Sequence, residues 1–501
     1  MSTALARRAL IGVAALLLTC LAWQPSAAAP PPDAPPAGPA SSSGSPASSS
    51  SPGLAERLES GVTGPKVARH LRALQDIADA EGGNRGYARP GFTRSAAYVS
   101  GQLTDAGYKV TRQSVPYTDF DVRKEDLSVQ AGGGNRKVRA LMTRFTPSTA
   151  KEGIDARAVS LPEGRTGCQV SDYDGVPVKG AVVVLARNAC GFGHQQKTAA
   201  EAGAVAVLLS YPTPSPRNIY RLIGMPASDF VLPMASVSQE DGERLAREAA
   251  HGDARVHLTL RARDIERTTV NLIAETRGGD PDDVVLMGGH LDSVPESPGI
   301  NDNGSTAATV LQTALELAPH QGAVRNKVRF MWWGAEELVN IGSSYYVDRL
   351  SEPERQRIAA VINGELLAPS NHARFVWDPG SGGGHALAGL FTGYFDRHQL
   401  PYDIQDPSAI GSDHLAFEAV GIPTGGIDGG NLGVKTPEQQ ARYGGHSGQM
   451  FDPCYHQTCD RLDRIDRRVL GQNAPALAWV VGHLATDDSA VRSVRQPSGR
   501  R

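Results

Sequence analysis

The chain has 501 residues, of which 40% are hydrophobic and 21% are charged, and its formal net charge is −3. This length exceeds one ordinary domain, so we expect two or three compact units, each able to bury a core. The near-neutral charge, with no dense stripe of Lys and Arg, argues against nucleic acid as a partner.

The first residues are typical of a secretory signal peptide. Arg7 and Arg8 precede an apolar run over residues 9–21, and small residues follow it. The run is shorter than the about 20 apolar residues that cross a bilayer. No later segment is a better transmembrane candidate. We therefore assign residues 1–29 to a signal peptide and expect a secreted, monomeric protein.

The cysteines predict two disulfides. Cys20 would leave with the signal peptide; it also permits a lipoprotein anchor, although Thr19 fits that signal poorly. An even number of cysteines in the remaining exported chain favours disulfide pairing. Three pairings are possible, and the local one is expected because short loops lose the least entropy when they close. That pairing joins Cys168 to Cys190 and Cys454 to Cys459.

A composition change marks the start of the folded chain. Residues 30–53 are almost wholly Pro, Ser, Ala and Gly, a composition typical of a flexible linker. Apolar residues then recur at helical spacing over residues 67–78, and a second amphipathic helix is predicted over 96–103. A strand is predicted at 108–110. Residues 54–120 are thus expected to be the first part of a folded domain.

Two further segments differ in composition and in their predicted secondary structure. Residues 121–263 contain short β runs, Gly-rich turns and a buried-strand candidate over 181–186, without a convergent set of metal ligands, which predicts a small β-rich insert. In residues 264–486, apolar strands alternate with helical segments such as 306–318. This pattern predicts an α/β fold with a mixed, largely parallel sheet covered by helices on both faces. The expected strands are 270–274, 284–287, 328–332 and 359–362.

The last residues, 487–501, are rich in Arg, Ser and Gly. Their composition predicts a solvated, disordered tail.

Residue types that bind metals follow the predicted strands of the larger segment. His290 follows the second strand, the pair Glu336 and Glu337 follows the third, and Glu365 follows the fourth. Asp302 precedes a predicted helix. Because ligands of such sheets bind at the carboxyl ends of the strands, these side chains are expected to converge on one metal site.

Six ordered blocks resemble the secreted zinc aminopeptidases of the M28 type, and the resemblance covers residues 54–477. A segment from 167 to 207 is similar to the protease-associated (PA) domain, for which no catalytic role is implied. The six blocks are Gly289–Ser293 (GHLDS), Gly299–Gly304 (GINDNG), Trp333–Leu338 (WGAEEL), Gly411–His414 (GSDH), Gly421–Gly425 (GIPTG) and Asp452–His456 (DPCYH).

The resemblance implies an aminopeptidase with two zinc ions; a structural Ca²⁺ is left open. A small disulfide ring would hold His456 and Tyr455, and a cis peptide is implied between Asp302 and Asn303. In the resembled site, one zinc is bound by His290 and Glu365, the other by His456 and Glu337, and Asp302 bridges both. The implied general base is Glu336, and Tyr455 donates a hydrogen bond to the oxyanion. Asp292 is the group that orients the His290 imidazole.

Two departures from the resembled pattern affect substrate recognition. Glu365 stands where the family has Asp, and Gly411 stands where Arg often precedes Ser-Asp-His. Glu365 therefore leaves carboxypeptidase or glutaminyl-cyclase activity as an alternative. A metal-free receptor-like protein is a further alternative, although the chain keeps Glu336 and an acceptable residue at every ligand position. A serine-hydrolase Gly-x-Ser-x-Gly elbow and a His-Glu-x-x-His helix are both absent. His414 and His446 are interpreted as structural.

The expected activity is the removal of N-terminal residues, large apolar ones, from peptides outside the cell. The carboxylates of Glu336 and Glu365 are the candidates for recognising the free amine.

Overall fold

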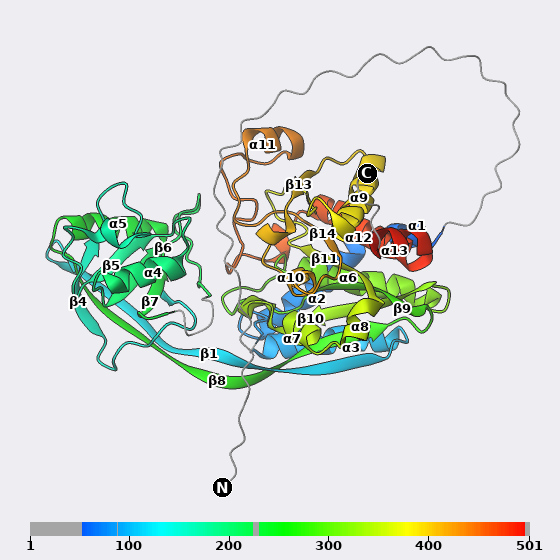
Figure 1. Ribbon diagram of the computed structural model, residues 1–501, viewed down its shortest axis with the longest axis horizontal. Helices are drawn as coiled ribbons and strands as arrows, with labels where there is room; N and C mark the ends of the chain where they lie inside the picture. Colours follow the sequence, from blue (N-terminus) through cyan, green and yellow to red (C-terminus); the bar gives the residue numbers. More distant parts are fainter. Residues whose placement is uncertain (1–52, 88, 224–229, 496–501) are drawn as a thin grey trace, which may run out of the picture. The chain divides into compact units, whose positions relative to one another are not determined.

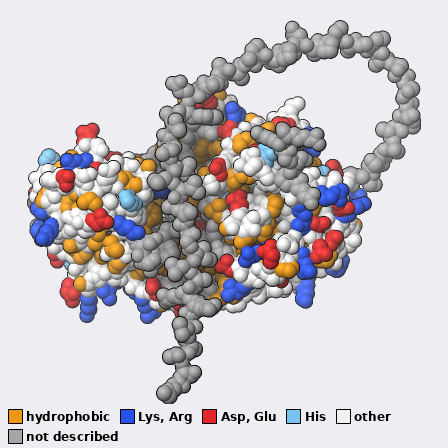
Figure 2. Space-filling model, viewed as in Figure 1, with side chains coloured by type: hydrophobic (Ala, Val, Ile, Leu, Met, Phe, Trp, Pro, Cys, Tyr) orange, Lys and Arg blue, Asp and Glu red, His pale blue; other side chains and the backbone are white. Residues whose placement is uncertain are grey.

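A computed structural model describes residues 53–87, 89–223 and 230–495. The predicted signal peptide, Cys20, the predicted linker except its last residue, and residues 496–501 lie outside the described residues. Within the described part, no helix is both long enough and apolar enough to span a bilayer. On the face shown in Figure 2, basic and acidic side chains are interspersed over the described residues.

The larger segment forms the predicted mixed sheet, which confirms the fold class (Figure 1). The neighbouring strands run in the order β13, β12, β14, β11, β9, β10, β8, and β1 pairs with β8. Pairs β10–β9, β9–β11 and β11–β14 are parallel, whereas β10–β8 and β12–β14 are antiparallel. The strands are β1 Val110–Ala131, β8 Arg255–Glu275, β9 Asp280–His290, β10 Asn326–Trp333, β11 Ile358–Glu365, β12 Phe375–Trp377, β13 Asp403–Gln405 and β14 Thr424–Asp428.

Helices cover both faces of this sheet because successive side chains of a strand point to opposite faces. Val285 and Met287 of β9 join the core beneath α1, α2, α6 and α12, whereas Leu286 between them joins Tyr346 and Phe417 of α7 and α10. The helices are α1 Leu54–Gly61, α2 Gly64–Ala80, α3 Pro90–Asp105, α6 Gly304–Leu317, α7 Ile341–Asp348, α8 Glu352–Arg357, α9 Gly382–Arg397, α10 His414–Glu418, α11 Pro437–Tyr443, α12 Arg467–Thr486 and α13 Asp488–Arg495.

The insert is built around a second group of parallel strands. Strands β4 to β7 pair in sequence order and in parallel, and β4 joins β8 in antiparallel fashion. Buried residues of α5 pack on one face of these strands and those of α4 on the other. The elements are β2 Gly134–Val138, β3 Leu141–Met142, β4 Ile154–Ser160, β5 Val182–Ala186, α4 Phe192–Glu201, β6 Ala206–Ser210, β7 Met234–Val237 and α5 Gln239–Ala250.

Strands β1 and β8 belong to both parts of the chain. They pair over their whole length, including Phe120 with Asp264 and Asp121 with Arg263, so the strands continue across the expected boundaries of the insert. A break in register lies close by, between Val122 and Lys124. The insert is therefore tied to the larger sheet by two continuous strands.

Both expected disulfides are present, Cys168–Cys190 in the insert and Cys454–Cys459 beside the sheet. The expected disorder of residues 487–501 is wrong for its first part, because Asp488–Arg495 forms helix α13. Val491 and Val494 are 1% and 2% exposed and pack into the large core. Arg495 also donates a hydrogen bond from Nε to Asp283 Oδ1 at 2.7 Å. The apolar surface of the sheet and its helices stabilises a segment that is too polar to fold alone.

Candidate metal centre

Three neighbouring parallel strands place their carboxyl ends at one edge of the sheet. His290 is the last residue of β9, and Glu365 is the last residue of β11 on one side of it. On the other side, Trp333 at the end of β10 pairs with His290. Three residues later, the short 3₁₀ helix η4 (Glu336–Leu338) begins with the adjacent carboxylates Glu336 and Glu337.

Loops supply the remaining candidate ligands. Asp302 lies just before α6, and its peptide bond to Asn303 is cis, as the resemblance implied. His456 lies in the ring closed by the Cys454–Cys459 disulfide and has a left-handed backbone with φ 57°. The structure thus brings together residues that are up to 166 positions apart, from His290 to His456.

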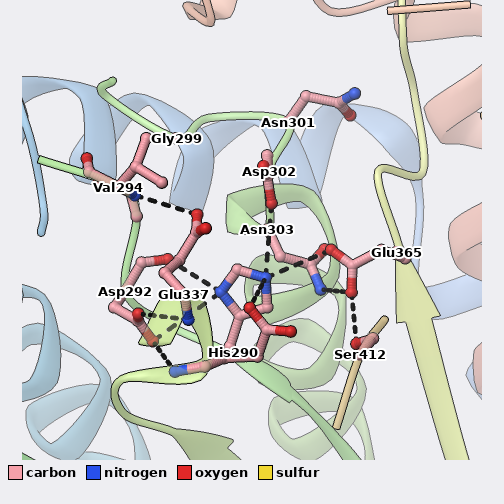
Figure 3. A network of polar contacts seen from close by, with 12 residues as sticks. His290, Asp292, Val294, Gly299, Asn301, Asp302, Asn303, Glu337, Glu365 and Ser412 are labelled. Carbon is pink, nitrogen blue, oxygen red and sulfur yellow. Dashed lines mark hydrogen bonds and ion pairs between the residues drawn. The ribbon is translucent and has the colours of Figure 1, made fainter. Parts of the chain in front are cut away.

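Two groups of three ligands share Asp302. In the first group, His290 Nε2 lies 3.3 Å from Glu365 Oε1 and 3.4 Å from Asp302 Oδ1 (Figure 3). In the second, His456 Nε2 lies 3.1 Å from Asp302 Oδ2 and 3.1 Å from Glu337 Oε2. In each group, the three ligand atoms lie within 4.8 Å of one another.

This donor set fits a pair of zinc ions. Imidazole nitrogens and carboxylate oxygens are the zinc ligands of catalytic sites, and a carboxylate that uses both oxygens can bridge two ions. Asp302 is 4% exposed, and its Oδ2 has no donor among the described residues other than the His456 imidazole, with which it forms an ion pair at 3.1 Å. A buried carboxylate with so little compensation is costly, and a bound cation would stabilise it further.

Charge accumulates around the two imidazoles. Burial lowers the pKa of His290, but the Glu336 and Glu365 carboxylates oppose it and hold the pKa well above its ordinary value. Burial likewise lowers the pKa of His456, and Glu337 and Asp302 reverse the shift. Without a metal, the site therefore keeps protons as counter-charges. Metal binding would displace these protons, so the affinity of the site for metal is expected to fall at low pH.

The two adjacent glutamates differ in their surroundings. Burial raises the pKa of the Glu337 carboxyl to about 6, although nearby His456 opposes the shift. Burial also raises the pKa of Glu336 well above its ordinary value, and the neighbouring Asp413 and Glu365 carboxylates add to the effect. Glu336 Oε2 lies 3.6 Å from His290 Nε2. Glu336 is therefore next to the ligands, in an environment that favours taking up a proton.

Asp292 supports the site in a way that differs from the sequence-based expectation. His290 Nδ1 pairs with the backbone carbonyl of Asp292 at 3.0 Å, whereas the Asp292 carboxylate is 3.9 Å away. That carboxylate instead accepts hydrogen bonds from the backbone N–H groups of Glu336, at 3.2 Å, and Glu337, at 3.3 Å. Asp292 thus orients the imidazole through its main chain and η4 through its side chain.

Sequence reasoning assigned no role to several residues that hold the ligands. Ser412 Oγ donates to Glu365 Oε2 at 2.6 Å, and Asn303 Nδ2 donates to the same oxygen at 3.0 Å. Asp460 Oδ2 accepts from the backbone N–H of Asp302 at 3.1 Å. Ser412 and Asn303 lie within quoted sequence blocks, so their position was a usable signal, whereas Asp460 lies outside all six blocks.

Arg85 also lies outside the blocks, and it is fully buried. Its guanidinium donates to the carbonyls of Leu291, Pro298 and Gly299, in the chain that connects His290 to Asp302. It therefore fixes the path of that connection. No local pattern around Arg85 indicated this role.

His414 and His446, the two histidines interpreted as structural, lie outside the two ligand groups. His414 contacts the carbonyl of Pro407 through Nε2 at 3.1 Å and packs against the Trp377 ring. His446 is exposed. Tyr455, by contrast, is stacked on His456 with ring centroids 3.8 Å apart. Burial raises the pKa of Tyr455 well above its ordinary value, so its phenol stays protonated and able to donate a hydrogen bond.

A cavity of about 190 Å³ opens onto the ligands. Its other lining residues are partly apolar and partly polar, the polar ones being Ser412, Asn431 and Tyr455. Gly411 also lines it, and a Cβ added there would meet no atom within 4 Å. The space where a side chain at position 411 would begin is therefore open. The apolar lining residues are Ile223, Val339, Leu366 and Ile410.

Comparisons with known proteins agree with this geometry. Residues 271–481 match Peptidase family M28, and residues 154–245 match the PA domain. The chain is 36% identical to the probable lipoprotein aminopeptidase LpqL of Mycobacterium tuberculosis, over 87% of this chain and 89% of the relative. It is 33% identical to an aminopeptidase of Pseudomonas aeruginosa, over 85% and 81% of the two chains. The solved structure of a zinc aminopeptidase from Bacillus subtilis has the same fold, with a TM-score of 0.65 at 22% identity over 85% of this chain and 96% of that one.

Proposed function

Because the chain belongs to peptidase family M28 and is an aminopeptidase-type zinc metallopeptidase, we propose that it removes apolar N-terminal residues from extracellular peptides with the help of two zinc ions. The observation that carries this proposal is the pair of ligand groups that share Asp302, with Glu336 beside them. The likeness to the relatives extends over most of the chain and includes both the catalytic region and the insert.

In this proposal, His290, Glu365 and Asp302 hold one zinc ion, and His456, Glu337 and Asp302 hold the other. Bound there, the two ions would supply Lewis acidity at the scissile carbonyl and lower the pKa of a water molecule between them.

The residues of the chain provide the proton transfers. Glu336 takes a proton from the attacking water and passes it to the leaving amine. Burial raises the pKa of Glu336, which makes its carboxylate a better base for the first step. Tyr455 donates a hydrogen bond to the oxygen that gains negative charge. Asp292 keeps Glu336 and Glu337 aimed in different directions through their backbone N–H groups.

Restriction to N-terminal residues follows from charge and size. A free amine is cationic, and the carboxylates of Glu336 and Glu365 at the cavity provide counter-charges for it. A cavity of about 190 Å³ suits a single side chain. Its apolar lining favours apolar side chains at the substrate's N-terminus.

Export is supported by the predicted signal peptide and by two disulfides, which persist in oxidising compartments. One relative is named a lipoprotein, so anchoring through Cys20 is the competing arrangement. Mass spectrometry of the mature N-terminus separates the two, because an acylated Cys20 would be the first residue of a lipoprotein.

The activity test uses a chromogenic leucine amide and its N-acetylated counterpart. Cleavage of the free-amine substrate alone, lost on chelation and restored by zinc with two ions bound per chain, is the expected result. A protein that binds two zinc ions and cleaves neither substrate would contradict aminopeptidase activity and favour carboxypeptidase or glutaminyl-cyclase activity. Failure to bind metal would favour a receptor-like protein.

A further inference from the structure

A segment of the insert reaches the loop that carries His456. Asn218 Nδ2 donates to the carbonyl of Pro453 at 3.2 Å, and Gln457 Nε2 donates to the carbonyl of Ile219 at 3.3 Å. Tyr220 lies next in the chain, with its hydroxyl 3.9 Å from Met450 Sδ. Residues 218–223, called the bridging segment below, therefore contact both sides of the ligand loop.

Arg221 holds the bridging segment between the catalytic part of the chain and strand β1 of the insert. Its Nε donates to Glu296 Oε1 of the catalytic part at 2.7 Å, and its two terminal nitrogens donate to Glu125 of the insert at 2.9 and 3.0 Å. The Arg221 side chain is only 10% exposed. Glu296 belongs to the connection between His290 and Asp302. Such bidentate, partly buried pairs fix position as well as adding attraction.

The side chains of the bridging segment divide between core and cavity. Ile219, Tyr220 and Leu222 are at most 7% exposed, and the carbonyl of Leu222 accepts a hydrogen bond from the backbone N–H of Arg144 at 3.0 Å. Ile223 is partly exposed. Among the described residues, it is the one member of the insert that lines the cavity containing the metal ligands.

We propose that Ile223 contacts the side chain of the substrate's N-terminal residue, so that the insert selects which residue is removed. The inference rests on the proposed aminopeptidase function. Ile223 lines a cavity of about 190 Å³ beside the ligands, which suits a single side chain, and in an aminopeptidase the side chain next to the scissile bond on that side is the N-terminal one. Arg221 is a positioning residue that acts through Ile223.

Substitutions of Ile223 should change selectivity in opposite directions. Ile223→Ala opens space for a large side chain, whereas Ile223→Phe fills it. A change of a few methylenes in an apolar pocket alters discrimination by about tenfold or more. The ratio of kcat/KM for the phenylalanine amide to that for the alanine amide is therefore expected to rise in Ile223→Ala and to fall in Ile223→Phe.

The experiment measures kcat/KM of the full-length zinc-loaded protein for free-amine amides of Ala, Leu and Phe, and for dipeptides that start with Leu and vary in the second residue. Val231→Ala, a change at an exposed position of the insert, is the matched control and should leave all ratios unchanged. Opposite shifts of the Phe-to-Ala ratio support the inference. General unfolding cannot produce them, because it lowers all rates together.

Arg221→Met should move the Phe-to-Ala ratio in the same direction as Ile223→Ala, mainly through KM, and Arg221→Lys should restore part of the selectivity. Unchanged ratios in active Ile223 variants would overturn the inference, as would a change confined to the second residue of the dipeptides. A wild-type protein that binds zinc but cleaves no free-amine substrate would overturn the proposed function, and this inference with it.

Discussion

At the scale of single residues, the site depends on separating two adjacent carboxylates. Glu337 reaches His456 and Glu336 reaches the neighbourhood of His290, although the two glutamates are consecutive. The separation arises where β10 ends: Ala335 has a left-handed backbone with φ 61°, and the chain then turns into η4. The Asp292 carboxylate holds the N–H groups of both glutamates, so each side chain keeps its own direction.

This separation predicts different effects for two otherwise identical substitutions. Glu336→Gln should lower kcat by about 10²–10⁴-fold while zinc content stays at the wild-type level, since the proposed base is not a ligand. Glu337→Gln should lose zinc. Steady-state kinetics combined with elemental analysis of the same samples distinguishes them. Near-normal kcat in Glu336→Gln would show that another group moves the proton.

Ser412 offers a test of the residues around the ligands. Its hydroxyl donates to Glu365 Oε2 at 2.6 Å. Removing such a hydrogen bond typically lowers metal affinity by about 10–100-fold. We expect Ser412→Ala to lower the affinity for one of the two zinc ions by this factor. Competition with a chelator of known affinity measures it. Ser408→Ala, at an exposed position four residues earlier, is the control. Equal affinity in both variants would refute a role for the hydroxyl.

At the scale of elements, some candidate ligands lie at strand ends and others lie in loops. Strand ends supply His290 and Glu365, whose positions the sheet fixes. His456 and Tyr455 lie in the loop closed by the Cys454–Cys459 disulfide, and this short ring limits how far they can move. The Cys168–Cys190 disulfide closes a longer loop within the insert. We therefore expect the Cys454–Cys459 disulfide to contribute mainly to activity and the Cys168–Cys190 disulfide mainly to the free energy of unfolding.

Removing each disulfide by paired Cys→Ser substitution should separate activity from stability. The loop-closure relation gives about 2 kcal/mol for the five-residue separation of Cys454 and Cys459, and about 3 kcal/mol for the 22-residue separation of Cys168 and Cys190. We expect the first variant to lose more activity at limiting zinc and the second to lose more unfolding free energy. Zinc titrations and denaturant unfolding measure the two quantities. The opposite ranking of activities would contradict the assigned role of the ring.

At the scale of the whole molecule, the insert and the catalytic part form one continuous sheet through β8 and β4. Strands β1 and β8 carry the chain into the insert and back. The bridging segment makes a further connection at the cavity. Because strands and bridging segment join the insert to the catalytic part at separate places, the insert can supply a side chain to the site.

Buried histidines make the stability of the whole molecule depend on pH. His372 is 5% exposed, and burial lowers its pKa to about 4. In the unfolded chain its pKa is about 6.5, so protonation favours unfolding. Its stabilising contribution is complete above about pH 6.5 and is lost as the pH falls toward 4. The shift corresponds to about 3 kcal/mol.

We therefore expect His372→Phe to lose less stability than wild type between pH 7 and pH 4.5, measured by urea unfolding at both values. His251→Phe, at an exposed position, should behave as wild type does. If wild type and His372→Phe lost equal stability on acidification, the neutral buried state of His372 would be refuted.

Much of the fold was predictable because it is encoded by local patterns. Apolar runs bounded by turns gave the strands, as in 284–287 within β9, and helical spacing gave α2, whose buried residues include Val67, Leu71 and Leu74. The types of the candidate ligands and their order along the chain were also visible. Helix α13 was missed because its packing depends on surface supplied by residues far away in the sequence.

The sequence by itself determined the fold class, and it favoured the local one of three disulfide pairings; with the family resemblance it also gave the candidate metal ligands. Only the tertiary structure decided that Asp292 contacts His290 through its main chain, that Ser412 and Asp460 hold the ligand groups, and that Ile223 lines the cavity. The physical reason is that periodicity and spacing report local conformation, whereas these contacts depend on how strands and loops distant in the chain pack against one another.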